Sequence, residues 1–356
     1  MVDSRIVEHA KVLVRHSTKV VKGDNVLIVV TDRGGMPLAV EVYKETVVAG
    51  GSPLIIATPG DAVRGHYKLV PEDYLKIFPK HYFELVKASD VVINIRSDEN
   101  TRFLADIDPK RMSIRDLTLK QIAEERLRKR WCVTQCPTSA YAQEADMSLE
   151  EYENFLYSAV LRDWDRELGQ MAKLKEIMDK TDQVRIVGEK TDLSMSIKGR
   201  IAVIDSGGHN MPGGEIFTAP VDDSTSGEVY FDLPAIRYGK EIRDVWLKLE
   251  KGVIVDYSAS KNEDFLKTMI NTDTGSKRLG ELGIGTNRGI TKFTRNILFD
   301  EKIAGTIHLA IGMAYKECLG KNESVIHLDL IKTIKPGRVT VDEKAVLEEG
   351  KLFWEK

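Results

Sequence analysis

Short apolar runs alternate with amphipathic stretches along the first half of the chain. The apolar run at residues 24–30 (DNVLIVV) is followed by helical periodicity from about Met36 to Ala49, which Gly50 and Gly51 end. Later apolar runs predict strands, and a charged periodic stretch predicts a helix. The predicted strands cover residues 24–30, 53–57, 90–95 and 131–134, and the charged helix covers 115–129. Strands alternating with helices predict an open α/β sheet.

The pattern changes after residue 148. Apolar residues recur every three or four positions from Ser148 to about Lys180, with Glu151 placed to complete a capping box, so we predict one long helix. From residue 183 onward, short apolar runs are separated by turns, which favours antiparallel strands. The sequence therefore predicts an N-terminal α/β domain over residues 1–185 and a mainly antiparallel β (α+β) C-terminal domain over 186–356.

Composition narrows the class of protein. The chain has 356 residues, of which 42% are hydrophobic and 30% are charged, with a net charge of -3. Such a chain is long enough for two globular domains, and nothing in it forms a basic surface for nucleic acid. Its apolar runs are too short to span a bilayer, and the amino terminus lacks a signal-peptide pattern, so we expect a cytoplasmic protein with no membrane or nucleic-acid partner.

The three cysteines are also consistent with a cytoplasmic protein. Cys132, Cys136 and Cys318 do not form a disulfide framework, and the Cys132–Cys136 pair has no second pair with which to bind zinc. We expect all three to be reduced, partly buried thiols.

Two short strand-like runs carry histidines. In IHLDLI, His327 and Asp329 are two residues apart, so on a strand both side chains leave the same face, about 7 Å apart along the backbone. In GTIHLAIG, Ile307, Leu309 and Ile311 alternate with His308, which predicts that the histidine faces away from the apolar layer. Taken singly, each is more often an ordinary polar residue.

Glutamates and a tyrosine accompany these histidines. Glu215 follows a Gly213-Gly214 turn, and Glu281 precedes Gly283, so both carboxylates stand where little side-chain bulk surrounds them. Tyr315 lies seven residues after His308 and could donate a hydrogen bond to an oxyanion. Carboxylates mixed with imidazoles suit Zn, Mn or Co, so together these residues predict a site for two divalent ions.

These motifs resemble the aminopeptidase T (AmpS/PepS-type, M29) family of metallopeptidases. The contexts that carry the resemblance are GGEIFTAP, LGELGIGTN, AGTIHLAIGMAY and IHLDLI, with residues 131–155 as a further similar segment. The resemblance implies a leucyl aminopeptidase-like metalloprotease. By carry-over it implies a set of metal ligands: Glu215, Glu281, His308, His327 and Asp329. It makes Tyr315 the catalytic tyrosine, and Glu301 resembles a further family glutamate at a slightly longer spacing from His308.

The implied activity is hydrolysis of the N-terminal residue from short peptides, with two ions (Zn, Co or Mn) activating a water molecule. Glu215 or Glu281 would bridge the ions or handle the proton, and the resemblance also implies a homodimer. Two alternatives remain. One is a single-iron ring-cleaving dioxygenase of the same fold family acting on a hydroxypyridine-like aromatic, and the other is a non-catalytic binding protein on this scaffold.

Overall fold

The computed structural model describes residues 2–237 and 239–355, and the chain divides into two compact units. One unit comprises the chain up to Leu161 together with Gly207–Gly213, and the other comprises Arg162–Ser206 and the chain from Gly214 onward. The predicted domain boundary at residue 185 differs from this division mainly in the helix α8 (Trp164–Met178), which belongs to the second unit. This helix packs against β7 (Val203–Asp205) and β9 (Glu215–Thr218) of that unit.

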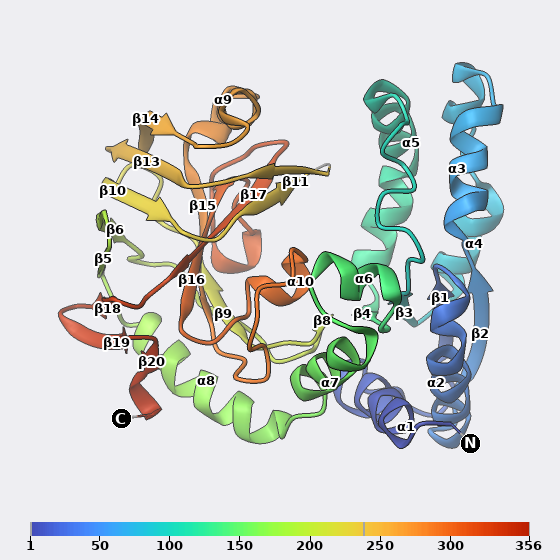
Figure 1. Cartoon of the computed structure of the whole chain (residues 1–356). Helices are drawn as coiled ribbons and strands as arrows, with labels where there is room; N and C mark the ends of the chain where they lie inside the picture. The colour runs from blue at the N-terminus through green and yellow to red at the C-terminus, as the bar shows by residue number, and fades with distance from the viewer. Residues whose placement is uncertain (1, 238, 356) are drawn as a thin grey trace. The chain divides into compact units, whose positions relative to one another are not determined.

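A five-stranded parallel sheet forms the centre of the first unit (Figure 1). Its strands stand in the order β2 (Ser52–Ala57), β1 (Asn25–Val30), β3 (Val91–Arg96), β4 (Arg130–Gln135) and β8 (Asn210–Met211). Every neighbouring pair is parallel. The predicted α/β sheet is therefore confirmed, and β8 joins it from the second half of the chain.

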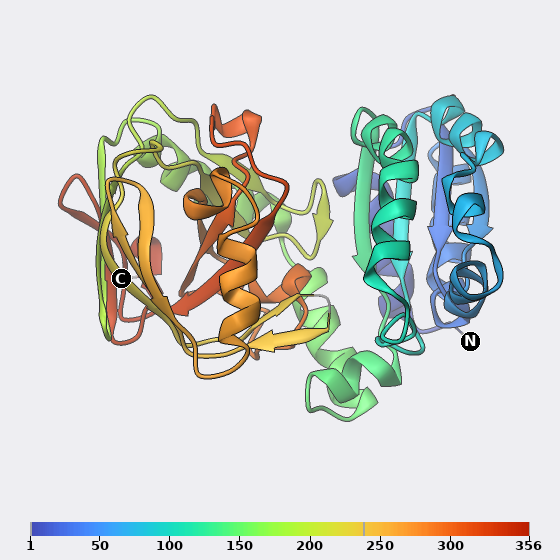
Figure 2. The same ribbon diagram turned by 90° about the horizontal axis from the view of Figure 1, so that it is seen from above.

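Helices cover both faces of this sheet (Figure 2). The helices of this unit are α1 (Ser4–Lys11), α2 (Met36–Val48), α3 (Gly60–Leu69), α4 (Lys80–Ala88), α5 (Pro109–Leu127), α6 (Ser139–Glu144) and α7 (Leu149–Val160). Of these, α2 packs against β1 and β2, α4 packs against β1, and α5 packs against β4. Leu27 and Val29 of β1 pack with Val86 of α4 and Ile122 of α5. Because strand side chains alternate, the apolar residues between them point to the opposite face, so both faces of β1 are buried, as expected for a parallel sheet.

One prediction about this region is wrong. The periodic stretch from Ser148 to Lys180 forms two helices, α7 and α8 (Trp164–Met178), and not one. The helix stops because Leu161 leaves the helical conformation, and Asp163 caps the next helix by accepting a hydrogen bond from the Arg166 amide at 3.0 Å. Ser148 caps α7 as predicted, accepting from the Glu151 amide.

The second unit is built mainly from antiparallel strands. An eight-stranded sheet has the order β14 (Val253–Ser258), β13 (Val245–Glu250), β10 (Ser226–Phe231), β6 (Thr191–Ser196), β5 (Gln183–Gly188), β18 (Gly337–Val341), β19 (Lys344–Glu348) and β20 (Lys351–Leu352). A five-stranded sheet has the order β17 (His327–Thr333), β16 (Thr306–Gly312), β15 (Leu279–Gly285), β9 (Glu215–Thr218) and β7 (Val203–Asp205). The remaining elements are the hairpin β11 (Ala235–Arg237) and β12 (Lys240–Ile242), with helices α9 (Glu263–Ile270) and α10 (Ile297–Asp300).

The two large sheets of this unit share one apolar core. Leu193 and Leu247 of the eight-stranded sheet pack in the same cluster as Leu282, Leu309 and Leu330 of the five-stranded sheet. The alternate residues of the five-stranded sheet therefore point away from that core. No helix among the described residues combines the length and the apolar character needed to cross a membrane.

Candidate metal centre

The side chains predicted as metal ligands lie on the face of the five-stranded sheet opposite the core. His308 stands between the core residues Ile307 and Leu309 on β16, and Glu281 precedes core residue Leu282 on β15. On β17, His327 and Asp329 flank core residue Leu328. The strand period of two thus directs the imidazoles and carboxylates of adjacent strands to one place, as the sequence pattern predicted for His308.

Glycines leave the space in which these groups meet. Gly283 pairs with His308 across β15 and β16, and a Cβ atom on Gly283 would lie 1.9 Å from His308 Nε2. Gly214 has a φ of +114°, and its Cβ atom would lie 2.5 Å from the Asn287 side chain. Any larger residue at these positions would displace a site histidine or the turn that carries Glu215.

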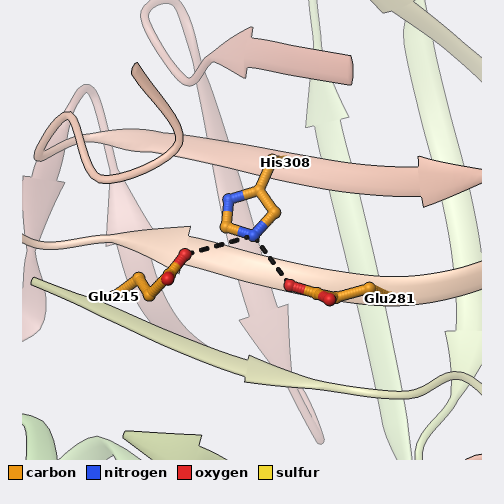
Figure 3. Close-up of side chains that lie close together, drawn as sticks. All are labelled: Glu215, Glu281 and His308. Atoms are coloured by element: carbon orange, nitrogen blue, oxygen red, sulfur yellow. Dashed lines mark hydrogen bonds and ion pairs between the residues drawn. The ribbon is translucent and has the colours of Figure 1, made fainter. Parts of the chain in front are cut away.

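Both predicted glutamates point at His308 (Figure 3). His308 Nε2 lies 3.0 Å from Glu281 Oε1 and 3.5 Å from Glu215 Oε2. The other oxygen of Glu281 lies 3.4 Å from His327 Nε2, which in turn lies 3.2 Å from Asp329 Oδ1. The structure therefore brings all five predicted ligands into one cluster, in which Glu215, Glu281 and His308 are buried and His327 and Asp329 are partly exposed. Glu281 belongs to both halves of it.

The cluster contains two groups with the geometry of a cation site. Glu215, Glu281 and His308 each offer a ligand atom within 4.8 Å of the others, and so do Glu281, His327 and Asp329. We call these the first triad and the second triad.

The imidazoles are oriented for metal binding. His308 Nδ1 donates to the Glu301 carbonyl at 3.1 Å, and His327 Nδ1 donates to the Met313 carbonyl at 2.9 Å. A carbonyl only accepts, so Nδ1 carries the proton in both rings and Nε2 faces the carboxylates, the arrangement that carbonyl partners enforce on metal-ligating histidines. Glu281 Oε2 is buried and makes no hydrogen bond with the described residues. The donor set therefore fits divalent cations.

The electrostatics of the cluster also suit a cation. Burial lowers the pKa of His308, but the hydrogen bond with Glu281 and the charge of Glu215 outweigh it and raise the pKa to about 9. Burial also lowers the pKa of His327, but the charge of Asp329 and its hydrogen bond outweigh burial and raise the pKa to about 10. Burial raises the pKa of Asp329, yet His327 outweighs it and the pKa falls to about 2. Without metal, protons on the imidazoles thus balance the carboxylates, and a cation would displace those protons.

Tyr315 lies beside this cluster, in the loop after β16. Its ring centroid is 5.0 Å from that of His327 and 5.7 Å from that of Phe217, and 40% of the residue is exposed. Burial of the hydroxyl and the nearby carboxylates, Glu281 first, raise the pKa of Tyr315. The hydroxyl therefore stays protonated at neutral pH and can act as a hydrogen-bond donor.

Sequence reasoning did not find Lys302. This lysine is fully buried, and its Nζ lies 3.1 Å from Glu215 Oε1 and also forms an ion pair with Glu301. Burial lowers the pKa of Lys302, but the charges of Glu215 and Glu301 raise it further, so the residue is an ammonium ion. Its signal in the sequence is weak, a lysine next to Glu301 in the FDEKIAG segment.

The predicted thiols take no part in the cluster. Cys132, Cys136 and Cys318 are buried.

An antiparallel domain that buries carboxylates and imidazoles together is typical of metal-dependent enzymes. Residues 2–351 match the thermophilic metalloprotease (M29) family, and the chain belongs to that family. The protein is therefore an enzyme of the metalloprotease class, as the motifs indicated.

Several curated proteins are similar in sequence. Aminopeptidase 2 of Geobacillus stearothermophilus is 27% identical over 316 residues, which cover 75% of each chain. Aminopeptidase PepS of Streptococcus thermophilus is 25% identical over an alignment of 380 residues that covers 91% of each chain. Aminopeptidase T of Thermus aquaticus is 34% identical over 159 residues, which are 40% of this chain and 37% of the relative.

Solved structures show the same fold. Wild-type AmpT from Thermus thermophilus superposes with a TM-score of 0.87 at 18% identity, covering 98% of this chain and 99% of AmpT. 2,5-Dihydroxypyridine dioxygenase from Pseudomonas putida KT2440 superposes with a TM-score of 0.61 at 15% identity, covering 98% of this chain and 96% of the other. At these identities the likeness concerns the fold alone.

Proposed function

We propose that this protein is an aminopeptidase that removes the N-terminal residue from short peptides with the help of two divalent metal ions, Zn, Co or Mn. The observation that carries the proposal is the position of Glu281, whose two oxygens contact His308 and His327, respectively. The family and the names of the relatives, all aminopeptidases, support the same reaction.

The two triads define which residues would hold the ions. Glu215, Glu281 and His308 would hold one ion, and Glu281, His327 and Asp329 would hold the other. In this proposal Glu281, which belongs to both triads, would be the carboxylate shared by the two ions, a role that the sequence leaves open between Glu215 and Glu281. When bound, such ions polarise a carbonyl oxygen and lower the pKa of a coordinated water molecule.

The chain's own residues supply positioning and proton handling. Tyr315, protonated and beside His327, would donate its hydroxyl hydrogen to the oxyanion that develops when the first peptide carbonyl is attacked. Glu215 shares one oxygen with Lys302 and turns the other toward His308. Burial raises the pKa of Glu215 to about 8, so we assign to this carboxylate the role of taking up and releasing the proton. The acidic surroundings favour the free amino group of a peptide.

One experiment tests the proposal directly. Bound metal per chain is measured on the purified protein, and the same sample is assayed for amino acid release from a panel of short peptides. Two ions per chain with release support the proposal. One iron per chain, no release and consumption of dioxygen with a dihydroxypyridine would instead identify the ring-cleaving alternative, and a protein that neither retains metal nor turns over would be a binding protein.

The remaining expectations concern the molecule's setting. We propose a homodimer in the cytoplasm, as the family resemblance and the sequence composition suggest. Sedimentation at working concentration tests the dimer, and a monomeric mass would contradict it.

A further inference from the structure

A buried cation, the ammonium group of Lys302, lies against the five predicted metal ligands. The lysine follows α10, and its backbone is held by hydrogen bonds from its amide to the Phe299 carbonyl at 2.9 Å and from the Asn287 amide to its own carbonyl at 3.0 Å. Lysine is almost never fully buried unless paired, and here the pairs are Glu215 and Glu301. The segment around Lys302 therefore places one positive charge at a fixed position in the cluster.

This charge falls unequally on the two triads. Glu215 divides its carboxylate, with Oε1 at 3.1 Å from Lys302 Nζ and Oε2 at 3.5 Å from His308 Nε2. In the part of the chain that the structure describes, the ion pairs of Glu281 and Asp329 are with histidines alone, and none is with a lysine or arginine. Among the described residues, the first triad therefore has a ligand, Glu215, in direct contact with a lysine ammonium group, whereas the charge of Lys302 acts on Asp329 of the second triad without an ion pair.

Contact with an ammonium group has two effects on a neighbouring cation site. It withdraws negative charge from the shared carboxylate, and it repels a second cation across a short, buried distance at which the dielectric constant is low. Histidines do not act in the same way, because each gives up its Nε2 proton when a metal ion binds. The ammonium group of Lys302 is instead held between Glu215 and Glu301 by two ion pairs and does not leave when an ion binds.

We propose that Lys302 is a built-in cation that makes the two metal sites unequal, so that the first triad binds its ion more weakly, and exchanges it faster, than the second triad. The inference rests on the proposed two-ion function and adds to it which ion is exchangeable. Lys302 acts through Glu215 and is a positioning residue.

The test is equilibrium dialysis of the metal-free protein against Co²⁺, with bound metal measured per chain. The wild-type protein should show two classes of site that differ at least tenfold in affinity. Glu215→Gln should abolish the weaker class and Asp329→Asn the tighter class, which assigns each class to a triad. The absorption bands of bound Co²⁺ report each site separately and do not depend on turnover.

Variants of Lys302 then test the role of its charge. Lys302→Met should raise the affinity of the weaker class at least tenfold and leave the tighter class within threefold, whereas Lys302→Arg, which keeps the charge, should retain the wild-type difference. Lys302→Gln keeps a hydrogen-bond donor without the charge and should resemble Lys302→Met. Circular dichroism establishes whether each variant is folded. One folded neutral variant, Lys302→Met or Lys302→Gln, is enough to test the role of the charge.

Lys332→Met is the matched control. Lys332 is 2% exposed in the same unit, but its Nζ contacts the Glu189 carbonyl at 3.3 Å and the Tyr230 ring, and no carboxylate of the cluster. Removing that buried ammonium group should leave both affinities unchanged.

Three outcomes would overturn the proposal. The two classes of site could have equal Co²⁺ affinities in the wild-type protein, or the affinity of the weaker class could fall or stay the same in Lys302→Met. The affinity of the weaker class could also rise as much in Lys332→Met as in Lys302→Met. Failure of the proposed function looks different, because the protein would then bind fewer than two ions or would bind two without releasing amino acids.

Discussion

His9 in the parallel-sheet unit and His308 in the antiparallel unit are both buried, with 1% and 0% of the residue exposed. Burial lowers the pKa of His9 to about 3, whereas the pKa of His308 rises to about 9. The neighbours account for the difference. Thr134 donates to the Met211 carbonyl and accepts a hydrogen bond from His9 Nε2 at 2.9 Å. His9 Nδ1 is buried and makes no hydrogen bond with the described residues, and no carboxylate contributes to the pKa, so the ring stays neutral.

His308 has two carboxylates within 3.5 Å of the same nitrogen. Burial alone therefore makes a histidine neutral and structural, and burial together with carboxylates makes it a candidate ligand. By this criterion the chemistry of the molecule lies in the antiparallel unit, and the following predictions test that contrast.

The largest effect is expected at Glu281. Replacing it with glutamine removes the one negative charge that contacts both histidines, so we expect metal content and amino acid release to fall together, each by more than about a hundredfold. Metal analysis and a peptide assay on the same sample measure this. Glu317→Gln, at an exposed position near Tyr315, is the control and should behave as wild type. Full metal retention in Glu281→Gln would remove this residue from the site.

Tyr315→Phe should separate chemistry from metal binding. The phenol donates a hydrogen bond without belonging to either triad, so we expect unchanged metal content, little change in KM and a loss of about 10²- to 10³-fold in kcat. Steady-state kinetics with a dipeptide check it. A wild-type rate would show that the hydroxyl has no part in the reaction.

Gly283→Ala tests the space around His308. The new methyl group would lie within 2.0 Å of ring atoms of His308, so the ring or the strand must move, at a cost of about 1–3 kcal/mol in the free energy of unfolding. Cobalt spectra should report a disturbed first triad. Gly169→Ala is the matched control, because Gly169 lies in α8 with nothing within 4 Å of a new Cβ atom, and it should stabilise by about 0.5–1 kcal/mol. A normal spectrum and normal stability in Gly283→Ala would contradict the packing described here.

The smallest effect concerns His9 and pH. Its folded-state pKa of about 3 lies below the unfolded value near 6.5, so the unfolded state takes up the proton first and stability falls as pH falls below 6.5. At pH 5 the loss is on the order of 2 kcal/mol relative to pH 8. Comparing denaturant unfolding of wild type and His9→Gln across this range isolates the contribution, because the variant lacks the titrating group.

The raised pKa of His308 has the opposite sign. In the metal-free protein, its contribution to stability is fully present below pH 6.5 and is lost as pH rises through about 9. His9→Gln should leave that alkaline limb unchanged. If both histidines weakened the protein on the same side of neutrality, the comparison between the two regions would fail.

Much of the site followed from local pattern. The alternation around His308 and the two-residue spacing of His327 and Asp329 place these side chains on one face of their strands whatever the strands pair with. Lys302 was missed because no local pattern indicates that a lysine beside Glu301 will be fully buried against Glu215, 87 positions earlier in the chain. The break between α7 and α8 was missed because Leu161 and Asp163 fit the apolar and polar positions of a continuous helix.

The sequence by itself determined the parallel and antiparallel halves, most strand positions and the residue types able to bind a cation, because these depend on the spacing of side chains within one segment. Only the tertiary structure decided that β8 joins the first sheet, that Glu281 lies between two histidines, and that Lys302 forms an ion pair with Glu215. Those facts depend on strand register and on contacts between residues far apart in the chain, and their energies arise only when the groups leave water together.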